Sequence, residues 1–306
     1  MQLLRFIFIL LFILLPLTLF AMQKDSKNRA KTIDELAKMY DSSTCKMCHP
    51  KEYDEWEKSL HARSIFGPEE VGRTAATFKT TIELGLKEWE HSGVKKPEDV
   101  KIEHLMLCAK CHLPQLADAE ESVAQEIVKN IYAFKEIGDE ASKNLQKLNI
   151  GCLICHQRNA IVHKWTDGYP MKDAVYGTKS GRHPDQSHPV MKESKIMKES
   201  ILCGQCHGLG PNFELENPSQ CATLYGSYLW SYIAEGGNKT CQQCHMRESG
   251  LGHNIQSYRS AELANMAIDM KVEVTPHYWR DGVKMIPQTS VMVSLTNKAG
   301  HVIPDG

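Results

Sequence analysis

The sequence lacks an excess of charge of either sign. Its 306 residues include 36 Lys and Arg against 37 Asp and Glu, for a formal net charge of -1. Binding to nucleic acid or to an anionic membrane surface depends on a basic excess, so we expect no nucleic-acid partner. The charged fraction of 24% and the hydrophobic fraction of 42% are typical of a soluble globular protein.

Long hydrophobic runs are also missing, with one exception at the N-terminus. Residues 6–20 are almost wholly apolar, follow the basic Arg5 and precede the small Ala21. The run is shorter than the about 20 residues that a membrane span needs, and the pattern is typical of a secretory signal peptide. We predict a signal peptide at residues 1–21, with an uncleaved membrane anchor as the alternative. In both cases the rest of the chain lies in the periplasm or another extracytoplasmic space.

Cysteine, in contrast, is plentiful and regularly placed. Ten of the eleven cysteines form five copies of the pattern Cys-x-x-Cys-His. The copies are Cys45, Cys48 and His49; Cys108, Cys111 and His112; Cys152, Cys155 and His156; Cys203, Cys206 and His207; and Cys241, Cys244 and His245. Only Cys221 is left over, and a small buried side chain is the simplest role for it.

This pattern is the attachment motif of c-type haem. Two thiols one helical turn apart can each bond to a vinyl group of one porphyrin, and the following histidine then binds the iron. Zinc ribbons use paired Cys-x-x-Cys knuckles, and exported proteins form disulfides. Neither alternative requires a histidine directly after every pair. We therefore predict five covalently attached haems c as cofactors.

The five motifs are irregularly spaced, and few residues separate them. We expect a mainly α fold, with long loops wrapped around a stacked multihaem core and a small C-terminal β segment. Apolar periodicity predicts helices at 52–64, 117–134 and 222–235, while the stretch 165–189 is rich in loop-forming residues.

Alternating residues at 271–275 and 290–296 predict strands. The domain prediction is thus a pentahaem domain at 22–270 and a β-rich segment at 271–306. So few strands are not stable alone. We therefore expect them to pack on the haem domain, or the segment to be incomplete.

Several stretches resemble the multihaem cytochrome c superfamily of hydroxylamine oxidoreductase and its tetrahaem electron-acceptor cytochrome. The first motif is followed by Tyr53, Trp56, Ser59, His61 and Ala62, and two further matching stretches are residues 240–246 with His253, and residues 297–306 with His301. The resemblance implies that His61, His253 and His301 are distal haem ligands. It also implies this role for His188, which precedes the fourth motif as a histidine does in related chains.

Nine histidines remain after the five motif histidines are assigned, which is enough for a second ligand on every iron. We add His163 to the predicted ligands, because it follows the third motif within a short loop. For His91, His183 and His277, exposed positions or a place beside a haem are the simpler roles. His104 lies one helical turn before Cys108, so it cannot easily reach its own haem but could serve another. Iron held between two histidines suits electron transfer, because no position is open to a substrate.

The predicted function is therefore electron transfer through closely spaced, mostly bis-histidine haems in a respiratory chain outside the cytoplasm. The partners would be a redox donor and acceptor, with a membrane quinol-oxidising complex as one candidate. The alternative is an oxidoreductase with one open haem that acts on a small nitrogen or sulfur compound. Two absences weigh against catalysis: the chain has no Cys-x-x-Cys-Lys motif, and it has fewer haem motifs than the superfamily's large enzymes. Permanent assembly into a larger complex stays open.

Overall fold

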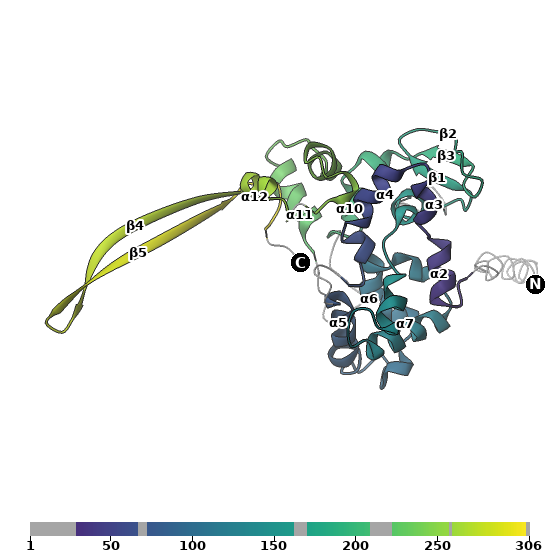
Figure 1. Cartoon of the computed structure of the whole chain (residues 1–306), viewed down its shortest axis with the longest axis horizontal. Coiled ribbons are helices and arrows are strands. Elements are labelled where there is room, and N and C mark those ends of the chain that lie inside the picture. The colour runs from purple at the N-terminus through teal and green to yellow at the C-terminus, as the bar shows by residue number, and fades with distance from the viewer. Residues whose placement is uncertain (1–28, 67–71, 162–169, 209–221, 257–258, 304–306) are drawn as a thin grey trace, which may run out of the picture.

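The computed structural model describes residues 29–66, 72–161, 170–208, 222–256 and 259–303. It shows a mainly helical body from which one long two-stranded arm projects (Figure 1). This confirms the mainly α fold with a small C-terminal β segment. The predicted signal peptide lies outside the described residues. Within the described ranges, no helix is both long enough and apolar enough to cross a membrane.

The first half of the body is built from short helices. They are α2 (Ile33–Met39), α3 (Ser43–Lys46), α4 (Pro50–Glu57), η2 (His61–Arg63), α5 (Arg73–Thr80), η3 (Thr81–Leu86), η4 (Pro97–Asp99), α6 (Ile102–His112), η5 (Pro114–Asp118), α7 (Glu121–Ala133), α8 (Glu140–Gln146) and η6 (Ile154–Arg158). The remainder comprises β1 (Ala174–Gly177), β2 (Gly181–Arg182), β3 (Val190–Glu193), η7 (Lys195–Lys198), α10 (Ile201–Gly204), α11 (Leu224–Tyr228), η8 (Leu229–Ile233), η9 (Gln243–Glu248), η10 (Gly252–Asn254), α12 (Ala261–Ala267), β4 (Ile268–Asp281) and β5 (Lys284–Asn297).

An apolar core fills the part of the body formed by α2, α5, α6, α7 and α8. The inward face of α7 buries Val123, Ile127, Val128 and Ile131, as its periodicity predicts. Leu36 of α2 is fully buried in the same cluster. Each such side chain stabilises the fold by about 1.5–3 kcal/mol. This core holds the helix α6, which carries the second haem motif, in a fixed position.

The predicted helices at 52–64 and 222–235 are interrupted in the structure. The first is α4, which starts with Pro50 at a position that suits proline, ends at Glu57 and is followed by the separate turn η2. The second divides into α11 and the π-helical turn η8. Periodicity indicates which residues share a face, but packing against neighbouring motifs decides where each turn ends.

The expected loop at 165–189 contains regular structure in its described part. Strands β1 and β2 lie within it, and β3 stands between them in a three-stranded sheet. Strand β1 pairs with β3 in parallel, while β2 pairs with β3 antiparallel. Ala174 and Tyr176 of β1 are buried on one face. The expectation of a plain loop failed here because such short strands are stabilised by tertiary packing rather than by local sequence.

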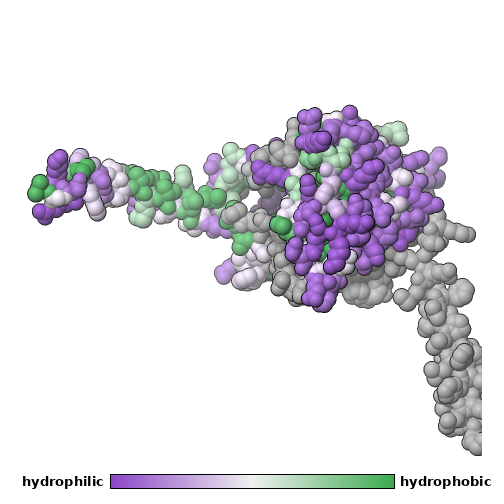
Figure 2. Space-filling model, turned by 90° about the horizontal axis from the view of Figure 1, so that it is seen from below, coloured by the Kyte–Doolittle hydropathy of each residue, from purple (hydrophilic) through white to green (hydrophobic). Residues whose placement is uncertain are grey.

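The C-terminal arm is longer than the predicted strands. Strands β4 and β5 pair antiparallel from Ile268 opposite Asn297 to Asp281 opposite Lys284, and Gly282 turns the chain with a φ of 60°. One face carries an apolar stripe that Figure 2 shows as a green band along the arm. The stripe consists of the cross-strand pairs Met270–Leu295, Val272–Val293 and Val274–Val291, all of them exposed.

Candidate haem-binding site

All five Cys-x-x-Cys-His motifs lie on helical turns. They belong to α3 and the residues after it, the end of α6, η6, α10 and η9. In the first and fourth motifs, the histidine N–H donates to the carbonyl oxygen of the first cysteine, with distances of 2.9 Å for both His49 to Cys45 and His207 to Cys203. Residues four apart on a helix share a face, so both cysteines and the histidine point to one side. This is the arrangement that attachment of one porphyrin requires.

The motifs adjoin one another although they are distant in sequence. The thiols of three cysteine pairs lie close enough to interact: Cys45 with Cys152, Cys111 with Cys206, and Cys203 with Cys241. The first motif is therefore next to the third, the second next to the fourth, and the fourth next to the fifth. Cys155 of the third motif also lies close enough to the fourth to interact with both of its cysteines. The five motifs thus form one continuous array.

Four motif histidines face a second histidine from another part of the chain. The ring centroids are 6.3 Å apart for His49 and His183, 6.2 Å for His207 and His61, 6.4 Å for His156 and His253, and 6.0 Å for His245 and His301. These histidines come from the N-terminal, middle and C-terminal thirds of the described chain. The tertiary fold brings them together in pairs.

The separation of these rings fits an iron atom between them. A metal–imidazole bond is about 2.0–2.1 Å long and the nitrogen lies about 1.1 Å from the ring centroid, so two imidazoles on opposite sides of one metal have centroids about 6.3 Å apart. The observed pairs span 6.0–6.4 Å. The buried Nδ1 of His183 has no hydrogen-bond partner among the described residues. The residues present therefore fit four haems with a histidine on each side.

Backbone carbonyls orient several of these rings. Because a carbonyl oxygen only accepts, the Nδ1–H of His156 donates to Tyr176 at 2.9 Å, and the Nδ1–H of His301 donates to Val302 at 2.9 Å. The other ring nitrogen then carries the lone pair that a metal needs. The sequence motif alone does not reveal these contacts.

Burial keeps the clustered histidines neutral. Burial, aided by the neighbouring His207 and His112, lowers the pKa of His61 to about 4. Burial also lowers the pKa values of His112, His156 and His245. A neutral imidazole is the form that binds a metal, so this surrounding matches the proposed ligands.

The second motif differs from the other four. Its histidine, His112, faces the phenyl ring of Phe78, with ring centroids 6.3 Å apart and ring planes at 83°. Phe78 belongs to α5 and is buried. A phenyl ring has no lone pair for iron. Within the described residues, the ring that faces His112 at this distance thus belongs to a side chain that cannot act as a ligand.

The predicted distal ligands meet different outcomes in the structure. His61, His253 and His301 each lie opposite a motif histidine, whereas His163 lies outside the described residues. His188 bonds through Nδ1 to Asp185 at 2.8 Å and, within the described residues, is not paired with a motif histidine. His183, five residues earlier, takes the place opposite His49. The position before the fourth motif pointed to His188, whereas the structure places His183, which directly follows β2, opposite His49.

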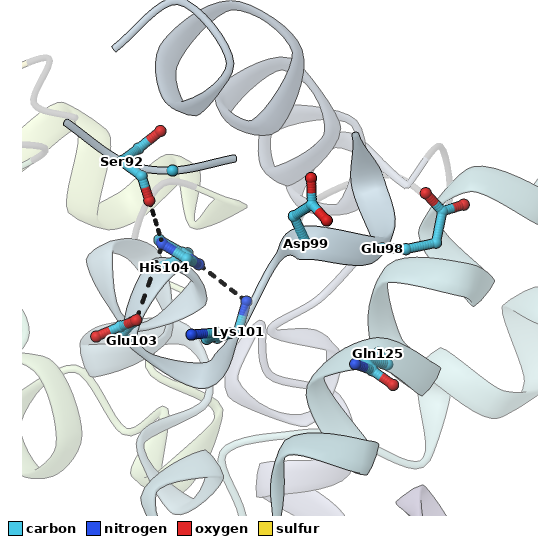
Figure 3. Close-up of a pocket in the computed structure, with 8 residues that line it drawn as sticks. Ser92, Glu98, Asp99, Lys101, Glu103, His104 and Gln125 are labelled. Atoms are coloured by element: carbon cyan, nitrogen blue, oxygen red, sulfur yellow. Dashed lines mark hydrogen bonds and ion pairs between the residues drawn. The ribbon is translucent and has the colours of Figure 1, made fainter. Parts of the chain in front are cut away.

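The remaining histidines are not paired with motif histidines in the described structure. His91 and His277 are exposed. Both nitrogens of His104 are engaged: Nδ1 accepts from the Lys101 N–H at 2.9 Å, and Nε2–H donates to the Ser92 carbonyl at 3.0 Å. Figure 3 shows these bonds beside a polar pocket of about 410 Å³. His104 therefore holds the start of α6 and has no nitrogen left for iron.

Comparison with known families matches part of the chain. The family model described as "Cytochrome c554 and c-prime" matches residues 44–157, which contain the first three motifs. The search of curated proteins and the search of solved structures found no match. The match covers His61 and Phe78 but ends before His183, the fourth motif and the fifth motif.

Proposed function

From the match of residues 44–157 to the family model "Cytochrome c554 and c-prime", we propose that the whole chain is a pentahaem cytochrome c that carries electrons in a respiratory chain. The family makes this a multihaem cytochrome with redox partners. The finer proposal rests on the fourth and fifth motifs, which repeat the same chemistry beyond the matched region.

The observation that carries the proposal is the set of four histidine pairs at 6.0–6.4 Å. Each pair would hold an iron from both sides, which suits electron transfer because the ligands stay the same in both redox states. When bound, each haem supplies a one-electron redox centre. The chain positions these centres, and burial and hydrogen bonds to the ligands tune their potentials.

The packing of the motifs suggests the order of the path. The first motif contacts the third, the third lies beside the fourth, and the fourth contacts the fifth. The second motif joins this series at the fourth through Cys111 and Cys206. We propose that electrons move along first, third, fourth and fifth haems, with the second as a side branch.

The location and the partners extend this proposal. The N-terminal apolar run supports export to the periplasm or another extracytoplasmic space, with either a cleaved signal peptide or a retained anchor. A membrane quinol-oxidising complex is a suitable donor, and a terminal reductase is a suitable acceptor. The formal net charge of -1 gives no support to a nucleic-acid partner.

The test is to express the full chain with haem-attachment machinery, count the haems by intact mass and record low-temperature electron paramagnetic resonance of the oxidised protein. We expect five covalent haems, with four low-spin ferric signals. Fewer covalent haems than motifs would contradict the pentahaem proposal. Fewer than four low-spin signals in a protein that carries five haems would contradict the bis-histidine assignment.

A second candidate function follows from Phe78 opposite His112. We propose that the iron at the second motif is open on the Phe78 side and binds a small nitrogen or sulfur compound. The ring of Phe78 makes this side apolar, and it would turn aside when a small compound reaches the iron. His112 is held by its Nδ1–H, which donates to the Ser64 carbonyl at 3.3 Å. This site would draw electrons from the branch at the fourth motif.

The spectra also test this second function. A single high-spin ferric signal that shifts on addition of nitrite, hydroxylamine or sulfite would support an open haem. Turnover of the same compound with a chemical electron donor would make the protein an enzyme. Five low-spin signals with no high-spin signal would show that another residue completes the second site, and the electron-carrier function would stand alone.

A further inference from the structure

Two of the motif contacts are built in the same way around a serine. The first and fourth motifs share the longer pattern Ser-x-x-Cys-x-x-Cys-His, with Ser42 before Cys45 and Ser200 before Cys203. The Ser42 hydroxyl oxygen accepts from the Cys152 N–H at 3.0 Å, and the Ser200 hydroxyl oxygen accepts from the Cys241 N–H at 3.1 Å. Each serine thus bonds to the first cysteine of a neighbouring motif.

These bonds satisfy backbone groups that the helical turns leave open. Cys152 and Cys241 are the first residues of their turns, and the first N–H groups of a helix have no partner within it. The preceding Gly151 has no side chain, and the Thr240 hydroxyl caps its own turn by accepting from the Gln243 N–H, which leaves the Cys241 N–H open. In both turns a serine from another motif accepts the bond of the first N–H.

The two serines do not serve their own helices. Ser42 precedes α3 and Ser200 precedes α10 at the position where a side chain normally caps, yet neither side chain makes that bond. Both serines are buried, with exposed fractions of 5% and 6%. Burial of a hydroxyl without a hydrogen-bond partner costs free energy. The bonds from both serines to the neighbouring motif therefore stabilise the fold.

The same two contacts also join the first cysteines of each motif pair. Cys45 meets Cys152, and Cys203 meets Cys241. The remaining contact is different, because Cys111 and Cys206 are both second cysteines. The residue three before Cys108 is a leucine. A serine thus accompanies both contacts between first cysteines. In the second motif, which makes the contact between second cysteines, a leucine stands at the same position.

We propose that Ser42 and Ser200 are equivalent positioning residues, each of which sets the spacing between two neighbouring haem motifs. Ser42 fixes the first motif against the third, and Ser200 fixes the fourth against the fifth. The inference rests on the proposed haem attachment at these motifs. The chain thus contains the same serine arrangement twice, once for each of two haem pairs. The second motif is attached by a different contact.

The geometry around Ser42 offers a second way to disturb its hydrogen bond to Cys152. A methyl group added at Gly151 would clash with the Ser42 hydroxyl oxygen. Gly151→Ala therefore displaces the hydroxyl without removing it. Ser43 offers a matched control in the same turn, because its hydroxyl donates to Asp41 at 2.8 Å and contacts no other motif in the described structure.

The experiment compares haem-loaded wild type with Ser42→Ala, Gly151→Ala, Ser200→Ala and Ser43→Ala. Hydrogen exchange read by mass spectrometry reports the bond, and redox titration followed by electron paramagnetic resonance reports the haems. Loss of one hydrogen bond should speed exchange about three- to tenfold. We expect this at residues 150–157 for the first two variants and at residues 240–247 for Ser200→Ala. Two low-spin signals should shift for Ser42→Ala, and a different pair of signals for Ser200→Ala.

The outcomes separate this inference from the proposed function. Ser43→Ala should match wild type, and Ser200→Thr should restore the wild-type signals because it keeps the hydroxyl. Unchanged exchange and unchanged signals in both alanine variants, with five haems bound, would overturn the positioning role alone. Uniform shifts of every signal in either variant would also overturn it. A wild type without covalent haems would refute the proposed function itself.

Discussion

Replacement of Phe78 by histidine is the most direct probe of the second motif. Phe78 is 4% exposed and its ring centroid lies 6.3 Å from that of His112. The four histidine pairs span 6.0–6.4 Å, with interplanar angles from 10° to 63°. An imidazole at position 78 would therefore have its ring centroid at a ligating distance from that of His112.

The expected result of Phe78→His is conversion of one high-spin ferric signal, out of five haems, into a low-spin signal. Loss of the buried phenyl ring costs at most the about 3–5 kcal/mol of a Phe→Ala change, and the new iron–nitrogen bond offsets part of that cost. Electron paramagnetic resonance measures the spin state, and denaturant unfolding measures the stability. Phe78→Leu is the control and should keep the high-spin signal.

Two results would refute this reasoning. A wild type without any high-spin signal would show that the second iron already has a distal ligand. A Phe78→His variant that keeps its five haems and its high-spin signal would show that Phe78 does not lie over the iron. Binding of nitrite to the wild type but not to Phe78→His would show that the added ligand closes the position that small molecules use.

Three further predictions concern ligation, the core and pH. We expect His183→Ala to turn one low-spin signal high-spin and His188→Ala to leave the haem spectra unchanged, because only His183 faces a motif histidine; the reverse result would restore His188 as the ligand. Leu36→Ala should lower the free energy of unfolding by about 2–5 kcal/mol because Leu36 is fully buried, whereas Leu84→Ala, at an exposed site, should change it by less than about 0.5 kcal/mol; equal effects in denaturant unfolding would contradict the assigned core. Hydrogen bonds from backbone N–H groups of its own turn lower the pKa of Asp139 from its usual 3.8, so its stabilisation is present above that value and is lost as pH falls through the lowered pKa. Unfolding of Asp139→Asn should thus depend less on pH in this acidic range, and an unchanged slope would count against the capping role.

The architecture was predictable where a local pattern carries it. The periodicity of α7 indicated its buried face, and the alternation in β4 and β5 indicated strands. The short sheet of β1, β2 and β3 was not predicted, because each strand has too few residues to show a period. The break between α4 and η2 was also hidden, since His61 must leave the helix to lie opposite His207.

The sequence by itself determined the chemistry of the site. Two thiols and a histidine within five residues can attach a porphyrin wherever the turn lies, so the five motifs were visible without any fold. What the tertiary structure decided is everything that depends on pairs of distant residues. It set His183 rather than His188 opposite His49, Phe78 opposite His112, and two serines against neighbouring motifs. The physical reason is that a distal ligand needs a donor nitrogen at the right distance from a motif histidine, and no local pattern records that distance.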